Sequence, residues 1–226
     1  MGAAAAPARL ADVVAALSSV SDLARGHPTD EAQRACLVAL ALARDRGIDG
    51  PALQDVYYTT LLRAVGCTAT SHELAALVGG DDVGVRRRGD MIDGADPRQG
   101  IGLLLEMGGP GLVLRAGPRV AKVAAEGARA DCEVGARVAQ RLGLPPAVSR
   151  AIDDGFERWD GRGSPKGAAG EAIALPARLA LVASACVMFE QVGGPRAAPR
   201  TLHRGTGSAA DSLRTPLSGR VAVPVP

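Results

Sequence analysis

Hydrophobic positions recur every three or four residues along most of the chain, which is the spacing of one helix face. The first such stretch runs from Ala8 to Ala24, and Gly26 with Pro28 supplies its stop. We expect this helix to pack its apolar face into the core, so that no periodic stripe remains unexplained by core packing. The stripe consists of Leu10, Val13, Val14, Leu17, Val20 and Leu23.

The same periodicity predicts further helices up to residue 192. Thr29 or Asp30 is a candidate cap for a second helix, which ends at Gly47, and Pro51 opens a third that runs to Gly66. A short helix then begins at Ser71, followed by a polar connection over 79–89. The remaining predicted helices cover 97–107, 112–126, 132–142, 147–158 and 176–192.

Two stretches rich in glycine and proline interrupt this pattern, at 108–111 and 159–171. From 193 to 226 the chain holds many Pro, Gly, Ser, Thr and Arg residues without periodicity, a composition that predicts a disordered tail. We therefore expect an N-terminal helix over 1–24, one helical domain over 25–192 and the tail over 193–226.

Composition favours the all-α class. Hydrophobic residues make up 47% of the 226 positions but aromatic residues only 2%, so the core must consist of Ala, Leu and Val. Such a core suits close helix packing better than a sheet. A formal charge of +2 gives no footprint for nucleic acid, and the one basic cluster, Arg86 to Arg88, is interpreted as a helix end or loop in preference to an anion contact.

The four cysteines, Cys36, Cys67, Cys132 and Cys186, show neither disulfide nor zinc spacing. No apolar run approaches the roughly 18 residues of a membrane span, and the N-terminus lacks the features of a signal peptide. A cytoplasmic location without membrane contact is expected.

The stretch from Phe156 to Ser184 resembles the signature of HD-GYP domains, a branch of the HD phosphohydrolase superfamily. That signature reads His-His-Glu-x-Trp-Asp-Gly-x-Gly-Tyr-Pro, then Gly-Glu-x-Ile-Pro and a helix with Ala-Arg. LLRAVG at 61–66 and DCEVG at 131–135 resemble two earlier family motifs, Leu-Leu-His-Asp-Ile-Gly and His-Pro-Glu-x-Gly. The resemblance implies a single HD-type helical bundle. The residues in step with the signature are Glu157, Trp159, Asp160, Gly161, Gly163, Pro165, Gly170, Glu171, Ile173, Ala177 and Arg178.

The resemblance also implies hydrolysis of cyclic dinucleotides, chiefly cyclic di-GMP, on two or three bound irons. The family's ligand positions are occupied differently here. Arg63 and Ala64 replace the His-Asp pair, Gly155 and Phe156 the double histidine, and Ser184 the late aspartate. Glu31 and Asp131 replace two further histidines, and isolated carboxylates beside an arginine make a poor transition-metal site. We therefore expect no catalytic residue, no metal and no cofactor.

A closer resemblance is to the HD-related N-terminal domains of LuxR-type regulators, which carry a helix-turn-helix module at the C-terminus. We expect no helix pair over residues 193–226, so no DNA binding is carried over with this resemblance. A remnant of a transcription regulator is one hypothesis. The shared patch consists of Val65, Gly66, Cys67, Thr68, Ser71, His72 and Glu73.

Several residues have a functional and a structural interpretation. Arg63 would pair with Asp131 or Glu31 and turn a metal site into a salt-bridged core. The Trp159 to Gly161 loop is a phosphate loop or, the favoured interpretation, a structural turn. His72 is expected at the surface or as a cap, with a ligand pocket as the alternative, and Cys67 is expected to be inert, with redox sensing as its alternative. His27 is expected in a loop, and His203 falls in the tail.

The sequence thus favours a non-catalytic regulatory or ligand-sensing domain, a pseudoenzyme that acts through a protein partner or as a homodimer. Its small-molecule ligand, if it has one, is unknown. The alternative is a metal-dependent phosphohydrolase or cyclic dinucleotide phosphodiesterase with an atypical site.

Overall fold

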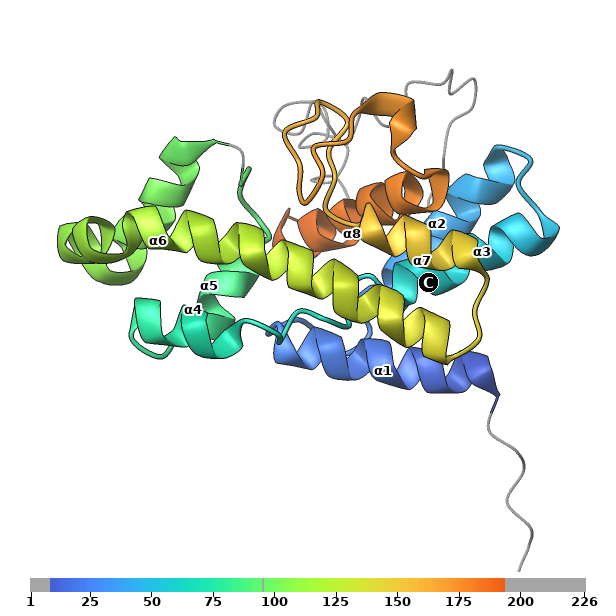
Figure 1. Cartoon of the computed structure of the whole chain (residues 1–226), viewed down its shortest axis with the longest axis horizontal. Coiled ribbons are helices and arrows are strands. Elements are labelled where there is room, and N and C mark those ends of the chain that lie inside the picture. Colours follow the sequence, from blue (N-terminus) through green and yellow to red (C-terminus); the bar gives the residue numbers. More distant parts are fainter. Residues whose placement is uncertain (1–8, 95, 194–226) are drawn as a thin grey trace, which may run out of the picture.

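The computed structural model describes residues 9–94 and 96–193, and these form helices without a β-strand (Figure 1). The all-α class is therefore confirmed. Residues 194–226 of the expected tail lie outside the described residues. The elements are α1 (Leu10–Ala24), α2 (Glu31–Asp45), α3 (Gly50–Leu62), α4 (Ser71–Val78), α5 (Asp82–Gly89), α6 (Pro97–Arg141), α7 (Pro146–Asp153), η1 (Gly170–Ala172) and α8 (Leu175–Gly193).

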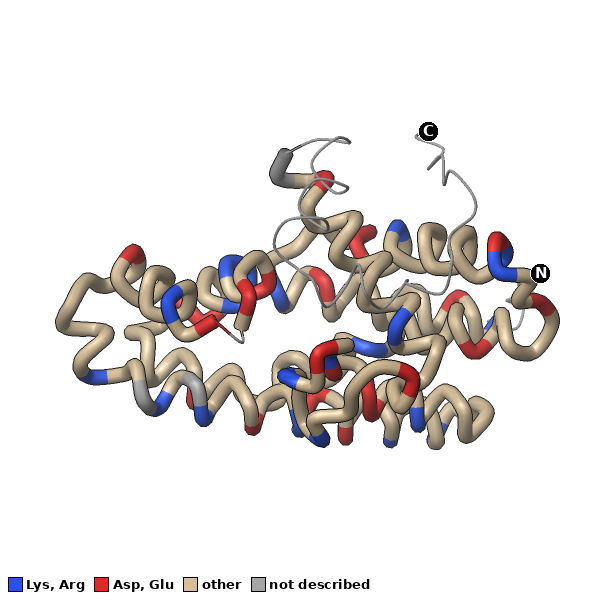
Figure 2. The backbone as a smooth tube through the Cα atoms, turned by 90° about the horizontal axis from the view of Figure 1, so that it is seen from above, with Lys and Arg blue, Asp and Glu red and all other residues tan. Residues whose placement is uncertain are grey.

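Two joined clusters of small aliphatic side chains form the core. One lies between α2, α3 and α8, around Ala39, Val56 and Leu179. The other joins α1, α2 and α3 to the second half of α6 and to α7, around Leu62 and Ile152. In Figure 1 the second half of α6 crosses the front of the molecule, and α1 runs along its lower edge. Acidic and basic residues are interspersed over the described chain (Figure 2).

The structure corrects two predicted connections. The stretch over 79–89 was expected to be a polar connection, but it contains α5, because the Asp81 carboxylate accepts a hydrogen bond from the amide of Gly84 at 2.8 Å. The break at 108–111 is confirmed as a kink, with non-helical backbone at Gly108 and Gly109.

The second corrected connection is the break expected between residues 126 and 132, where α6 is continuous. Gly127 lies there against Thr70, and a Cβ at Gly127 would come within 2.9 Å of the Thr70 hydroxyl oxygen. The glycine permits a close contact between α6 and the segment before α4, and it does not end the helix. No helix in the described residues is long and apolar enough to cross a membrane.

Candidate functional site

Charged side chains are buried where the turn between α1 and α2 meets the end of α5. The imidazole of His27 lies between two carboxylates, with Nδ1 2.8 Å from Oε2 of Glu31 and Nε2 2.9 Å from Oδ2 of Asp90. The Arg25 guanidinium contacts the same Asp90 oxygen and lies 4.0 Å from Glu31. Arg25, His27, Glu31 and Asp90 form what we call the charged cluster.

The charges of this cluster reinforce one another. Burial favours neutral His27, but hydrogen bonds to Asp90 and Glu31 outweigh it and raise the pKa of His27 to about 9. Burial opposes the charge of Asp90 as well, yet Arg25 and His27 hold the pKa of that carboxyl at about 2. The pKa of Glu31 is also lowered against the effect of burial, chiefly by the hydrogen bond from His27. His27 is therefore an imidazolium at neutral pH.

The positions at which the family's ligands were expected do meet in space. The Nη1 atom of Arg63, at the end of α3, donates a hydrogen bond to the Ser184 hydroxyl of α8 at 3.1 Å. The guanidinium lies 5.6 Å from the centre of the Phe156 ring, and a Cβ at Gly155 would lie 3.9 Å from that of Arg63. Ala64 is buried directly beyond Arg63. The positions matched to the family's ligand motifs thus lie together at one place in the fold.

The expected pairing of Arg63 with Asp131 or Glu31 was wrong. Among the described residues no carboxylate lies within salt-bridge distance of Arg63, and its contacts are Ser184 and Phe156. Burial, and then repulsion by Arg25, lowers the pKa of the Arg63 guanidinium. Arg25, and not Arg63, is the arginine that contacts Glu31.

A cavity of about 810 Å³ opens beside the charged cluster, between α4, α5 and the two halves of α6. Its wall is mainly aliphatic, whereas Arg25, Arg86, Asp90 and Asp131 line its charged end. This volume falls in the range of roughly 300–1,000 Å³ that is usual for small-molecule sites. The aliphatic wall includes Leu74, Val85, Ile92, Leu103, Leu104, Val113, Val120 and Val123.

Asp131 is a buried carboxyl group in the wall of this cavity with unused hydrogen-bonding capacity. Its side chain is buried, with the residue 5% exposed, and its Oδ1 atom has no hydrogen-bond partner. Burial raises the pKa of Asp131, and a hydrogen bond from the Cys67 thiol and the charges of Arg86 and Arg25 offset part of that rise. A carboxylate with a raised pKa is a stronger base than a solvated one.

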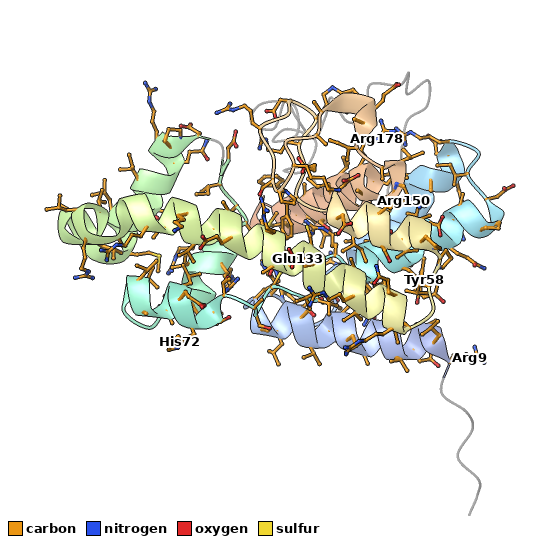
Figure 3. The ribbon with its side chains drawn as sticks, in the orientation of Figure 1. Arg9, Tyr58, His72, Glu133, Arg150 and Arg178 are labelled. Carbon is orange, nitrogen blue, oxygen red and sulfur yellow. The ribbon has the colours of Figure 1, made fainter. Side chains whose placement is uncertain are left out.

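Cys67 lines the same cavity next to Asp131. Burial raises the pKa of the Cys67 thiol to about 12, so the reactive thiolate is scarce at neutral pH. This agrees with the inert role expected for Cys67. His72 is exposed on α4, as predicted, and points away from the molecule (Figure 3).

The retained motif loop makes contacts that shape the fold around the cavity. The buried Glu157 carboxylate accepts a hydrogen bond from the amide of Lys166 at 2.6 Å, and Arg178 of α8 lies over the Trp159 ring. Arg158 reaches Asp93 at 2.9 Å, which ties the loop to the segment that lines the cavity after α5. A Cβ at Gly163 would come within 2.3 Å of the Arg158 amide nitrogen, so the tight loop requires glycine there. These contacts support the structural interpretation of the loop.

The other motif residues extend this network. Asp160 forms an ion pair with Arg158 at 2.9 Å, and Gly161 adopts a positive φ of 74° that favours glycine. Pro165 lines a smaller cavity of about 260 Å³ next to Cys132.

The residues present do not fit the metal centre that the family resemblance implies. Both ring nitrogens of His27 already contact carboxylates, and an arginine completes the cluster. In the described part of the chain no three His, Cys, Asp or Glu side chains are grouped so that they could hold a metal ion.

Sequence reasoning missed Arg25, the burial of His27, and Asp90. His27 does lie in a turn, as expected, but it is only 7% exposed. The spacing of His27 and Glu31, four residues apart at the start of a helix, was the available signal. No sequence signal pointed to Asp90, because this residue lies at the end of α5, a helix that was not predicted.

Comparison with known proteins gave two similarities, and no protein-family model matches the chain. The chain is 27% identical over 192 residues to the 3'3'-cGAMP-specific phosphodiesterase 3 of Vibrio cholerae, an alignment that covers 80% of this chain and 41% of the relative. It also resembles the crystal structure of a cyclic GMP-AMP-specific phosphodiesterase from V. cholerae. That match has a TM-score of 0.61 at 22% identity, and covers 87% of this chain and 45% of the other.

The chain thus spans less than half the length of the proteins it matches. The structural match shows the fold, and together the two findings support the resemblance to the HD-domain phosphohydrolase superfamily. They give no support to the LuxR-type resemblance, which stays a prediction. The expectation of a non-catalytic regulatory domain, a pseudoenzyme, is contradicted, because the similar protein is an enzyme. The findings favour the alternative, a cyclic dinucleotide phosphodiesterase.

Proposed function

We propose that this chain is a cyclic dinucleotide phosphodiesterase domain of the HD-GYP type, acting on a 3'3'-linked substrate in the cavity beside the charged cluster. The observation that carries the proposal is the position of the charged end. It lies next to the residues that replace the family's ligands, in a chain similar to a phosphodiesterase over 80% of its length.

Arg25 and Arg86 bind the phosphodiester. Both side chains line the cavity, and a guanidinium offers paired donors that match phosphate oxygens. Arg25 is held by Asp90, and Arg86 donates a hydrogen bond to the Ser71 hydroxyl at 3.3 Å, so both cations are oriented before the substrate binds. Preorganised cations stabilise the charge that develops on the phosphoryl oxygens.

Asp131 acts as the general base. Its Oδ1 atom accepts a proton from a water molecule as the water oxygen forms a bond to phosphorus. The bond from phosphorus to the ribose oxygen breaks, and the departing oxygen takes a proton from solvent. The product is a linear dinucleotide. Because the residues do not fit a metal centre, no step depends on one.

The test is an assay of the purified chain with 3'3'-cGAMP, cyclic di-GMP and bis(p-nitrophenyl) phosphate, with linear products separated by chromatography. Asp131→Asn should reduce kcat about 100-fold or more. Glu133→Gln is the matched control, since Glu133 lies two residues further along α6 with an exposed side chain (Figure 3). Absence of product from all three substrates would reject the proposed activity. Equal turnover by Asp131→Asn and the wild type would reject Asp131 as the base.

A further inference from the structure

The apolar stripe of α1 faces solvent. The exposed fractions are 36% for Leu10, 39% for Val13, and 66% for both Val20 and Leu23. The helix instead buries a mostly polar face, which consists of Val14, Ser18, Ser21 and Asp22. The expectation that the stripe packs into the core was therefore wrong for all of its members except Val14 and the half-buried Leu17.

Hydrogen bonds explain why the polar face lies inside. The Oδ2 atom of Asp22 accepts a hydrogen bond from the amide of Ala32 at 2.9 Å and so caps the start of α2. The hydroxyls of Ser18 and Ser21 donate to carbonyls one turn back, at 2.8 and 3.0 Å. The serine bonds satisfy the buried hydroxyls within α1, and the Asp22 bond alone joins α1 to α2. None of them involves the exposed stripe. A continuous apolar stripe of this kind marks an interaction site.

The order of residues along the stripe is symmetric about its centre, between Ala16 and Leu17. Leu10 corresponds to Leu23, and Val13 corresponds to Val20. Two copies of such a helix placed antiparallel across a two-fold axis set valine against valine, with leucines at the same level. Self-complementarity of this kind is what an isologous dimer contact requires.

Charge and shape agree with the same partner. Asp12 is the one exposed charged residue within Leu10–Ala24, and in the antiparallel pair it lies level with Ser21 of the other copy. The two Asp12 side chains would lie about 13 Å apart along the axis, beyond the Debye length at ordinary ionic strength. Ala16 at the centre lets the backbones approach closely. In Figure 1 no described element lies beyond α1 at the lower edge of the molecule.

We propose that α1 pairs with α1 of a second copy of this chain, antiparallel, with Val13 of one copy opposite Val20 of the other. A single helix pair buries less than the roughly 1,200–2,000 Å² of a standard interface, so we expect a weak dimer whose population depends on protein concentration. The contact lies away from the cavity, so it is independent of the phosphodiesterase proposal.

Analytical ultracentrifugation of the full chain, from about 1 to about 200 μM, tests this proposal. The wild type should shift from monomer to dimer as its concentration rises. The double variant Val20→Glu with Leu23→Glu should raise the dissociation constant by about tenfold or more. Leu114→Glu on α6 is the control, because Leu114 is 87% exposed and lies outside the stripe. Helical content by circular dichroism checks that each variant folds. A wild type that stays monomeric, or a dimer unaffected by the double substitution, would overturn the proposal.

Single cysteine substitutions test the orientation. Ala16→Cys lies beside the two-fold axis and should form an intermolecular disulfide with its own copy under mild oxidation. Leu10→Cys should not, because an antiparallel pair separates the two copies of residue 10 by about 20 Å. The wild type, with its own four cysteines, gives the background level. Efficient crosslinking of Leu10→Cys, with little from Ala16→Cys, would reject the antiparallel arrangement.

Discussion

The Nε2 atom of His27 lies 2.9 Å from Oδ2 of Asp90, and this contact joins the α1–α2 turn to the end of α5. Glu31 faces the other nitrogen of the imidazole from α2, and Arg25 approaches Asp90 from the end of α1. The histidine therefore connects three elements that meet at the cavity, and its charge contributes to the stability of the domain.

This arrangement predicts a loss of stability at alkaline pH. Hydrogen bonds to Asp90 and Glu31 outweigh burial and raise the pKa of His27 from 6.5 to about 9 in the folded protein. The folded state thus binds the proton more tightly than the unfolded chain does. The resulting stabilisation is complete below pH 6.5 and is lost as the pH rises to about 9, by on the order of 3 kcal/mol.

Urea denaturation at pH values across this window measures the effect. His27→Gln should be less stable than the wild type near pH 6.5 and should show a flatter profile above it. Asp22, whose pKa is raised to about 6 chiefly by burial, titrates at the lower edge of this window, and the comparison with His27→Gln separates its contribution because both proteins contain Asp22. A wild-type profile that stays flat from pH 6.5 to 9 would contradict the charged state assigned to His27.

The two buried arginines should differ in how much stability is lost when their charge is removed. Arg25→Leu leaves Asp90 and Glu31 with a weaker cationic environment, so unfolding free energy should fall by about 3 kcal/mol. Arg63→Leu removes a cation that contacts Ser184 and Phe156 but no carboxylate, and its effect should stay within about 1 kcal/mol. Urea denaturation at neutral pH compares them. An equal loss in both variants would show that Arg63 has an anionic partner.

Gly66 should be sensitive to a single methyl group. A Cβ there would lie 2.5 Å from both the Cα and the carbonyl oxygen of Asp131, so the segment that follows α3 would have to move away from α6 at the candidate base. Gly66→Ala should lower stability by about 2 kcal/mol and reduce turnover as well. Gly102→Ala is the control, because nothing lies within 4 Å of its Cβ and alanine favours a helix. Thermal denaturation measures both variants. A melting temperature lower for Gly102→Ala than for Gly66→Ala would contradict the close contact at Gly66.

Chelation should leave this protein unchanged. Since the described residues form no metal-binding set, dialysis against EDTA should alter neither the melting temperature nor the hydrolysis rate. Elemental analysis before and after dialysis measures the metal content, which is then compared with the melting temperature and the hydrolysis rate. A fall in melting temperature that added manganese or iron restores would show that the chain does bind a structural metal.

Part of the site followed from the sequence. The aligned positions Arg63, Gly155, Phe156 and Ser184 do come together, because matching motifs in a helical bundle fix the same helix ends. The contacts among them did not follow. Which carboxylate an arginine reaches depends on side-chain positions from separate helices, and the missed α5 supplies the decisive one, Asp90.

The sequence by itself determined the all-α class, the helix from Leu175 onward and the irregular loop over 159–171, because periodicity and glycine content act locally. The tertiary structure decided which face of α1 is buried. Periodicity marks an apolar stripe, but the hydrogen bond from Ala32 to Asp22 turned the polar face inward and left the stripe at the surface. The spacing predicts an apolar stripe, and only the packed helices show that no element of the described residues covers it.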